Sequence, residues 1–491
     1  MKVTVQVVTI DANGQESIRE LACIAREELT AESLGLSVAD SKALLQSLQE
    51  VVVEWQMKTY LDSQRHCPDC GKLRPSKGAH HSAFRTVFGQ IPVESPRLEH
   101  CPCQEHDTQS FSPLAVLLPE KTTPELLYLE TKWASLASYG MSVKMFEDVL
   151  PLDAPLQTVT IRNHVLKIAE RLEGMLGDEN GCYIEGCPRD WGELPMPDGP
   201  LTVGIDGGYV KAQGMEQGSF EVIAGKSILA FRRDEEEPIP SSKTFAFVQT
   251  YDDKPRRRLF EVLQSQGMQM HQQIEFLSDG GDDVRDVQLS LSPEADHLLD
   301  WFHVTMRITT LIQAAQGLPE TSGEGNSALQ ADVLRDLERI KWFLWHGNTF
   351  KALQVLGSVE SHLEVEDLTS GNVTAARLYK AVSEFTTYIE NNQGFIPNYG
   401  ERYRNGERIS TGFVESTVNY VVSKRMVKKQ QMRWSQRGAH LLLQIRTRVL
   451  NGEWEETFRQ WYPGFRTQRQ PAAASAGFSM RGGLVSSKGL C

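Results

Sequence analysis

The stretch "LTVGIDGGYVKA", residues 201–212, begins as an apolar strand and turns at paired glycines. Two more strand-like stretches follow, "SFEVIAGKSILAF" at 219–231 and "KTFAFVQTY" at 243–251. A helical pattern, "PRRRLFEVLQSQGM" at 255–268, then precedes a fourth strand, "QQIEFLSDGG" at 272–281. Three strands in succession, followed by alternating helix and strand, predict a domain in which helices pack on one β-sheet.

This order of elements is typical of an RNase H-like fold. A short helix at Asp283–Leu289 and a strand-like segment, "ADHLLDWFHV" at 295–304, continue the alternation. In such a sheet the first and fourth strands are neighbours. We therefore expect residues at the ends of these two strands to converge.

Asp206 and Asp279 stand at those two strand ends, and paired glycines follow each of them. Both could simply be turn residues, which is a common role of Asp before Gly. Asp282 and Asp283 compete with Asp279, although they are more natural as helix N-caps. The functional reading is a magnesium site, because Mg²⁺ binds few protein carboxylates and keeps water and phosphate as its other ligands.

A third carboxylate for such a site is Glu415, in "ISTGFVESTVNYVVSKRMVKKQQMRW" at 409–434. As an isolated residue it could be an ordinary first-turn glutamate of a helix. The stretch around it is strongly basic, although the chain of 491 residues has a net charge of −13. A basic helix beside a metal site would neutralise DNA phosphates. The alternative interpretation is a charged helix face that contacts only solvent. The predicted DNA contacts are Lys424, Arg425, Lys428, Lys429, Arg433 and Arg437.

Four cysteines flank a predicted β-hairpin, "HHSAFRTVFGQIPVESPRLEH" at 80–100, whose tip lies near Gly89. Cys67 and Cys70 form a C-x-x-C knuckle, and Cys101 and Cys103 form a tighter C-x-C pair. Two thiolates from each end of a hairpin suit tetrahedral Zn²⁺ in a zinc ribbon. One ligand could instead be a histidine, from the set His66, His80, His81, His100 and His106.

The remaining segments complete an α+β multidomain chain. Helical periodicity predicts helices at 16–29 and 37–64, with Ser37 as the N-cap of the second. Residues 124–175 resemble a helix-turn-helix, for which a plain αα-hairpin is the alternative. The predicted domains are an N-terminal helical region (1–62), a zinc ribbon (63–110), the helix-turn-helix-like region (120–176), a linker (177–200), the first part of the core (201–306), an all-α insertion (307–404), the basic C-terminal part of the core (405–465) and a disordered tail (466–491).

Several of these motifs occur together, and in the same order, in one family. The series "CPDCG", "FRTVFGQIPVESPR", "CPC", "GIDGGYV", "FLSDGGDDVRD", "HLLDWFHVTMR" and "STGFVESTVNYVVSKRMVKKQQMRWS" resembles bacterial insertion-sequence transposases of the ISKra type, related to Mutator-like DDE transposases. The resemblance implies that Asp206, Asp279 and Glu415 are the catalytic triad. It also implies that Asp300 and His303 form the D-x-x-H element of such enzymes, with His303 either structural or positioning DNA and the triad. Trp434 matches the family's tail, in a packing or a base-stacking role.

The implied activity is metal-dependent phosphoryl transfer on DNA, with Mg²⁺ or Mn²⁺ at the triad and Zn²⁺ at the cysteines. Water would cut at the element's terminal inverted repeats, and the freed 3′-hydroxyl would attack target DNA. The resemblance implies a homodimer or higher oligomer on double-stranded DNA. Alternatives are an RNase H-like structure-specific nuclease and a domesticated DNA-binding protein without transposition activity.

Other classes of protein lack support in the sequence. The chain has no G-x-G-x-x-G after a strand, no G-x-x-x-x-G-K-[ST] and no G-x-S-x-G, which are signatures of nucleotide-binding and hydrolase sites. No apolar run reaches the ~18 residues of a membrane helix, and the N-terminus does not resemble a signal peptide. We therefore expect a cytoplasmic protein with no membrane partner, and the resemblance implies a bacterial one that joins the nucleoid when bound to DNA.

Overall fold

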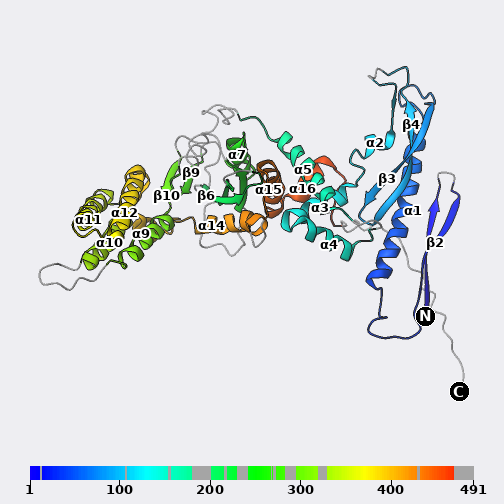
Figure 1. Ribbon diagram of the computed structural model, residues 1–491. Coiled ribbons are helices and arrows are strands. Elements are labelled where there is room, and N and C mark those ends of the chain that lie inside the picture. Colours follow the sequence, from blue (N-terminus) through cyan, green and yellow to red (C-terminus); the bar gives the residue numbers. More distant parts are fainter. Residues whose placement is uncertain are drawn as a thin grey trace. The chain divides into compact units, whose positions relative to one another are not determined.

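A computed structural model (Figure 1) describes residues 1–11, 14–104, 108–152, 156–179, 201–214, 218–228, 242–266, 268, 272–281, 295–318, 329–427 and 432–468. The chain forms two compact units, and each is described by itself. Unit 1 comprises Met1–Leu129, Val149–Ala154 and Gly452–Cys491. Unit 2 comprises Glu130–Asp148 and Pro155–Asn451. Most of the predicted linker, the predicted helix at Asp283–Leu289, and the predicted tail beyond residue 468 lie outside the described residues.

Unit 1 begins with an antiparallel hairpin of β1 (Lys2–Ile10) and β2 (Glu16–Ala25). The prediction of a helix at 16–29 is therefore wrong. The apolar spacing there fits the period of a helix and that of a strand. Pairing with β1 stabilises the strand, because Ile18 and Ile24 lie opposite Val8 and Val3 in the register. The predicted helix after Ser37 is confirmed as α1 (Val38–Gln64), and Ser37 and Asp40 form its capping box.

The predicted hairpin between the cysteine pairs is confirmed. Strands β3 (Ser76–Thr86) and β4 (Gly89–Glu99) pair antiparallel, and β5 (Ser110–Phe111) extends the sheet beside β4. Gly89, next to the two-residue turn, has a φ of 121°. The same unit contains α2 (Pro113–Leu117) and α16 (Trp454–Trp461), and the N-terminal part of α3 (Pro124–Leu136). Tyr128 packs against Phe458 there, with ring centroids 5.3 Å apart.

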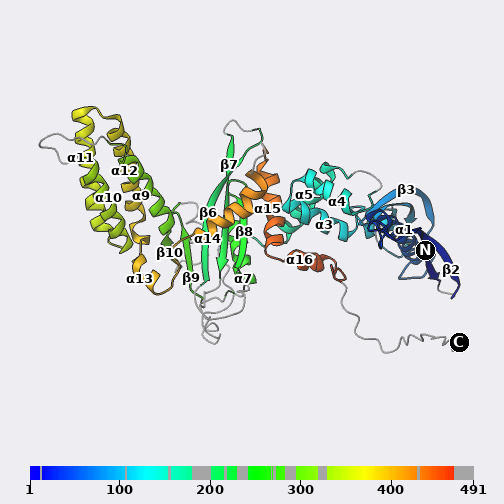
Figure 2. The same cartoon turned by 90° about the horizontal axis from the view of Figure 1, so that it is seen from below.

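Unit 2 is built on a five-stranded sheet of order β10-β9-β6-β7-β8 (Figure 2). Its strands are β6 (Leu201–Lys211), β7 (Ser219–Ile228), β8 (Ser242–Val248), β9 (Ile274–Ser278) and β10 (Asp296–Leu299). β7 is antiparallel to its neighbours β6 and β8, whereas β9 and β10 run parallel to β6. The expected pairing of the first strand with the fourth is confirmed.

Helices cover both faces of this sheet. On one face, α7 (Pro255–Ser265) buries Leu259 and Leu263 against the odd-numbered residues of β6, including Val203 and Ile205. On the other face lie α14 (Gly412–Val418) and its continuation η2 (Asn419–Val427), which is a π-helix. The predicted single basic helix is thus a short α-helix followed by a π-helical segment, a form that often occurs at functional sites.

The open edge of the sheet at β8 is covered by α15 (Gln436–Leu450). His440 accepts a hydrogen bond from the Val248 N–H, and the Gln444 side-chain amide donates to the Ala246 carbonyl. These side chains replace a neighbouring strand, and they prevent the edge from pairing with another chain.

The segment predicted as an all-α insertion (307–404) falls in a block whose described residues are mainly helical from Trp301 onward. The block contains α9 (Trp301–Ala315), α10 (Leu329–Trp345), α11 (Thr349–Ser370), α12 (Val373–Asn392), η1 (Gln393–Phe395) and α13 (Tyr399–Arg404). These helices share one apolar core with Leu299 of β10. The strand-like prediction at 295–304 holds only for 296–299, because Asp300 caps α9 and turns the chain into a helix.

The predicted helix-turn-helix-like region consists of α3, α4 (Tyr139–Val149) and α5 (Thr158–Met175). Trp133 and Phe146 pack together with ring centroids 4.4 Å apart, so the C-terminal part of α3 lies against α4. The contacts fit both a helix-turn-helix and an αα-hairpin. Along the part of the chain that the structure describes, no helix combines the length and the apolar character needed to cross a membrane.

Candidate active site and cysteine cluster

Three aspartates lie level with one another on or just after β6, β9 and β10. Asp279 and Asp300 directly follow β9 and β10, whereas Asp206 lies in the middle of β6. The predicted turn after Asp206 is wrong, because the strand continues through both glycines in its pairing with β7. The parallel register pairs Gly204 with Leu277, so two further residues along each strand bring Asp206 level with Asp279. The register between β9 and β10 pairs Ser278 with Leu299, which places Asp300 level with Asp279 as well. The sheet topology therefore brings three carboxylate-bearing positions to the region of the carboxyl ends of β9 and β10. Ligands of such sheets usually bind at the carboxyl ends of strands.

Asp300 is fully buried and serves as a structural anchor. Its Oδ1 accepts hydrogen bonds from the backbone N–H of Phe302 (2.9 Å) and of Thr411 (3.0 Å). Its Oδ2 accepts from the Thr411 hydroxyl and lies 2.7 Å from Nδ1 of His303. Since Thr411 directly precedes α14, one carboxylate connects the start of α9 to the start of the helix that carries Glu415. It also fixes the imidazole ring of His303.

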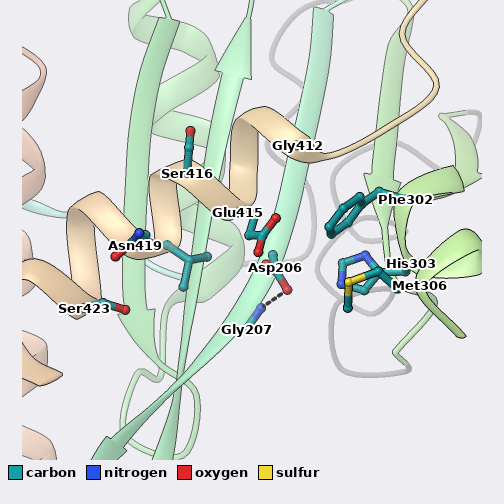
Figure 3. Close-up of a pocket in the computed structure, with 11 residues that line it drawn as sticks. Asp206, Gly207, Phe302, His303, Met306, Gly412, Glu415, Ser416, Asn419 and Ser423 are labelled. Atoms are coloured by element: carbon teal, nitrogen blue, oxygen red, sulfur yellow. Dashed lines mark hydrogen bonds between the residues drawn. The ribbon is translucent and has the colours of Figure 1, made fainter. Parts of the chain in front are cut away.

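Glu415 faces Asp206 across a cavity of about 610 Å³. Figure 3 shows the two carboxylates pointing toward each other, one from α14 and one from β6. Phe302, His303 and Met306 of α9 form another wall. The remaining lining residues are Gly207, Gly412, Ser416, Val418, Asn419 and Ser423. Among the described residues that line the cavity, His303 is the only basic one, so this part of the lining favours a cation.

The electrostatics of the cavity point the same way. Burial raises the pKa of the Asp206 carboxyl above its usual value, and the charges of Asp279 and Asp300 act in the same direction. The charge of His303 and the N–H of Gly207, 2.8 Å from Asp206 Oδ1, oppose this rise. The hydrogen bond to Asp300 raises the pKa of His303, against the effect of its burial. Acidic groups held this close repel one another, and a bound divalent cation would relieve that repulsion.

Asp279 does not line the cavity, and its backbone is held by a hydrogen bond and a tight turn outside it. The Tyr388 hydroxyl of the insertion donates to the Asp279 carbonyl at 3.0 Å, and burial raises the pKa of that hydroxyl, which keeps it a donor. Gly280 follows with a φ of +89°, and a Cβ there would lie 2.5 Å from Oδ1 of Asn392. A tight, left-handed turn directly after Asp279 therefore requires glycine.

The three predicted catalytic carboxylates do not form one compact ligand cluster. Asp206 and Glu415 line the cavity and Asp279 does not, although its charge acts on both Asp206 and His303. Their ligand atoms are not all within 4.8 Å of one another. One ion would need them closer, whereas two ions about 3.5–4 Å apart are held by ligands that spread further. The described geometry therefore does not by itself define a metal site at these three residues.

The four predicted zinc ligands do form such a cluster. The Sγ atoms of Cys67, Cys70, Cys101 and Cys103 all lie within 4.8 Å of one another, and no described histidine joins the group. Four of the Sγ–Sγ distances are 3.3–3.5 Å. Tetrahedral Zn–S bonds of ~2.3 Å imply sulfur separations of roughly 3.8 Å. The cluster could therefore bind Zn²⁺, and the C-x-C spacing does not prevent it.

The thiols of this cluster differ in their proton affinity. Burial raises the pKa of Cys67, but N–H groups of Cys70 and Asp69 and the neighbouring thiols outweigh it and lower this pKa to about 6. Hydrogen bonds with the other three thiols raise the pKa of Cys103. Thiolates are the form that binds metal, so metal uptake would displace protons from the cluster.

A second group with metal-ligating side chains is Glu173, Asp252 and His440. Here a guanidinium already supplies the positive charge. Arg258 lies 2.9 Å from Glu173 and 2.8 Å from Asp252, and its Nη1 donates to Gln444 at 2.6 Å. We therefore regard this group as a buried ion-pair network that joins α5, α7 and α15.

The predicted DNA-contacting residues divide into two kinds. Lys424, Arg433 and Arg437 are exposed, with Arg437 paired to Glu170, whereas Lys428 and Lys429 lie outside the described residues. Arg425 is a correction, since only 5% of it is exposed. Its Nε donates to the Ala134 carbonyl, and its guanidinium lies 5.1 Å from the ring centroid of Trp434. Arg425 therefore has a packing role.

Trp434 itself is buried, and its backbone pairs with β6 at Lys211 and Ala212. Of the two roles left open for Trp434, the structure thus favours packing. Sequence reasoning missed Thr411, Tyr388 and the apolar wall formed by Phe302 and Met306. The signal for Thr411 was present, because a threonine before "GFVES" is a natural helix N-cap. No local signal marked Tyr388, which acts 109 residues from Asp279.

Comparison with known proteins assigns the chain to no family. No family model matches the chain, and a search of curated proteins finds no similar one.

Proposed function

We propose that this protein is a DNA transposase that cuts the ends of its own mobile element and joins them to target DNA. The observation that carries the proposal is the pairing of Asp206 with Glu415 in one cavity, at the sheet edge where Asp279 lies level with Asp206. Glu415 comes 136 positions after Asp279 in the chain, so their joint action in the proposed reaction depends on the tertiary fold.

We further propose that the core of unit 2 is RNase H-like. Support comes from the strand order, in which three antiparallel strands precede two that run parallel to the first. The all-α block between β10 and α14 matches the place of the expected insertion. Fold alone does not determine activity, so the proposal depends on the site.

In the proposed reaction, Asp206, Asp279 and Glu415 would hold two Mg²⁺ ions. When bound, such ions supply an activated attacking oxygen and stabilise the leaving oxygen of phosphoryl transfer. The protein's own part is positioning. Asp300 fixes the ring of His303 through Nδ1, which leaves Nε2 to contact a phosphate oxygen in the cavity. Phe302 and Met306 would exclude water from that side.

DNA binding would involve surfaces outside the cavity. The exposed cations Lys424, Arg433 and Arg437 carry the charge expected of contacts to the DNA backbone. The cysteine cluster with bound Zn²⁺ and the helices α4 and α5 would recognise the terminal inverted repeats. Two ends must be joined in one reaction, so we propose that a dimer is the active form.

The test is cleavage and joining of a labelled duplex that carries the DNA flanking this coding sequence, with Mg²⁺ or Mn²⁺. Wild type is compared with Asp206→Ala, Asp279→Ala and Glu415→Ala. We expect cutting at the element end and joining to a target plasmid, with both lost in every variant while DNA binding persists. Cutting without joining would favour a nuclease, and binding without cutting would favour a domesticated DNA-binding protein. Activity that survives in all three variants would contradict the proposed site.

A further inference from the structure

We propose that Gly204 and Gly208 are positioning residues that let α14 lie directly on β6 and so bring Glu415 to Asp206. This inference rests on the proposed function, because it concerns the same pair of carboxylates. It adds two residues that neither contact substrate nor bind metal. It also gives a physical reason for the spacing of the stretch "GIDGG".

The alternation of a β-strand places the two glycines on the same face as Asp206. Successive side chains of a strand point to opposite faces, so positions 204, 206 and 208 share one face. The neighbouring residues 203 and 205 are buried against α7 on the other face. The face of Asp206 is covered by α14, which contacts both β6 and β7. Figure 2 shows α14 crossing these strands.

On α14, the residues that meet the glycines are Val414 and Val418. They are four residues apart, so they lie on one side of the helix. Both are buried. Glu415 lies one position after Val414 and three before Val418, at the border of this apolar stripe. Contact of the two valines with the strand therefore fixes the distance of α14 from β6, and with it the position of Glu415 in the cavity.

The space at Gly204 allows no side chain. A Cβ at this position would lie 2.1 Å from Cγ2 of Val414 and 2.8 Å from Cζ of Phe413. Ordinary contact begins at 3.4 Å, so a methyl group would require a shift of more than an ångström by the Val414 side chain, by α14 or by β6. Val414 is fully buried, which leaves its side chain little room to turn aside. The backbone of Gly204 does not have a positive φ, and its need for glycine is one of close approach.

Gly208 shows the same contact in a milder form. A Cβ there would lie 2.9 Å from Cγ1 of Val418, and its next neighbours are 3.9 Å away. One methyl group of one residue thus accounts for the conflict. Removal of the methyl groups of Val418 on the helix can therefore compensate for a methyl group added at Gly208 on the strand.

The same sheet supplies a matched control on its opposite face. A Cβ at Gly225 of β7 would lie 2.2 Å from Cζ of Phe245, an overlap as severe as that at Gly204, and 2.9 Å from the carbonyl oxygen of Gly204. Gly225 pairs with Ile205, and Phe245 belongs to the core beneath α7. A methyl group at Gly225 would therefore disturb the sheet core and the backbone at Gly204 without direct contact with α14.

The experiment compares Gly204→Ala, Gly208→Ala, Gly225→Ala and the double variant Gly208→Ala/Val418→Ala in the full chain. Three quantities are measured for each: the melting temperature, the Mn²⁺ dissociation constant of the zinc-loaded protein, and the rate of end cleavage. An ångström of misplacement costs about 10²-fold in rate, which is the loss expected for Gly204→Ala. We expect about tenfold weaker Mn²⁺ binding for the same variant, by analogy with lost second-shell support.

Gly225→Ala should lower the melting temperature at least as much as Gly208→Ala and leave Mn²⁺ affinity and cleavage near wild type. Adding Val418→Ala to Gly208→Ala should restore most of the lost Mn²⁺ affinity. The inference is overturned if Gly204→Ala and Gly208→Ala bind Mn²⁺ like wild type. It is also overturned if Gly225→Ala loses as much affinity as they do, or if Val418→Ala restores none of it.

Failure of the proposed function has a different signature. If wild type cuts no DNA, the transposase proposal fails, while Mn²⁺ affinities and the rescue by Val418→Ala still decide the role of the two glycines.

Discussion

The buried carboxylate of Asp300 should be the most sensitive position of the site for stability. It accepts bonds from Phe302, Thr411 and His303, and it joins β10, α9 and the start of α14. We predict that Asp300→Ala destabilises the core by about 3–5 kcal/mol. Loss of a helix N-cap costs ~1 kcal/mol, and each buried donor left without a partner costs about 1–3 kcal/mol.

Asp300→Asn is the matched variant for this prediction. It keeps one oxygen that can accept from the N–H groups of Phe302 and Thr411, but it removes the charge and replaces Oδ2, the partner of His303 and of the Thr411 hydroxyl, by an amide NH2. We expect it to cost about 1–2 kcal/mol. Urea unfolding of the full chain, followed by tryptophan fluorescence, measures both values, because Trp301 directly follows Asp300 and packs against Trp345.

The pH dependence of stability provides a second readout. The hydrogen bond to Asp300 raises the pKa of His303 above 6.5 in the folded protein. This pair therefore stabilises fully below pH 6.5, and its contribution is lost as the pH rises through the folded pKa of His303. In Asp300→Asn that loss should disappear. The reasoning is refuted if Asp300→Ala costs less than about 1 kcal/mol, or if the alanine and asparagine variants are equally destabilised.

Three further predictions concern other parts of the chain. Cys70→Ser should release the bound Zn²⁺ that a colorimetric chelator detects, whereas Cys23→Ser, outside the cluster, should retain it. Burial opposes the charge of Glu173, but bonds from His440 and Arg258 hold its pKa at about 2, so stability should fall as the pH drops from 4.5 through 2, and Glu173→Gln should flatten this part of an acid titration. Lys424→Ala should lower the salt dependence of DNA binding, measured as the slope of log K against log salt, by about 0.9 and leave sequence preference unchanged.

The sequence was sufficient for the sheet and for the placement of two aspartates level with each other on neighbouring strands. Strand patterns before "DGG" located Asp206 and Asp279, and parallel pairing of their strands follows from the element order. The cysteine cluster was predictable because its ligands are close in sequence on both sides of one hairpin. These features depend on short-range patterns and simple topology.

The rest depends on tertiary contacts that no local pattern records. The stretch at 16–29 has apolar spacing that fits a helix, and only its partner β1 makes it a strand. Arg425 lies in a basic run that looks exposed, yet it packs between Tyr139 and Trp434 because η2 lies against α4. A charge run does not state which of its members face inward.

The most direct test of the account is one ratio, the Mg²⁺-supported rate of end cleavage by wild type over that by Glu415→Gln at saturating DNA. The substitution keeps the size of the side chain and removes the charge that faces Asp206. Glu384→Gln, an exposed change on α12, is its control. The account predicts a ratio of at least about 10²–10³ for Glu415 and a ratio near one for Glu384. A Glu415→Gln enzyme that cuts at the wild-type rate would contradict the central claim that Asp206 and Glu415 form one metal-binding site.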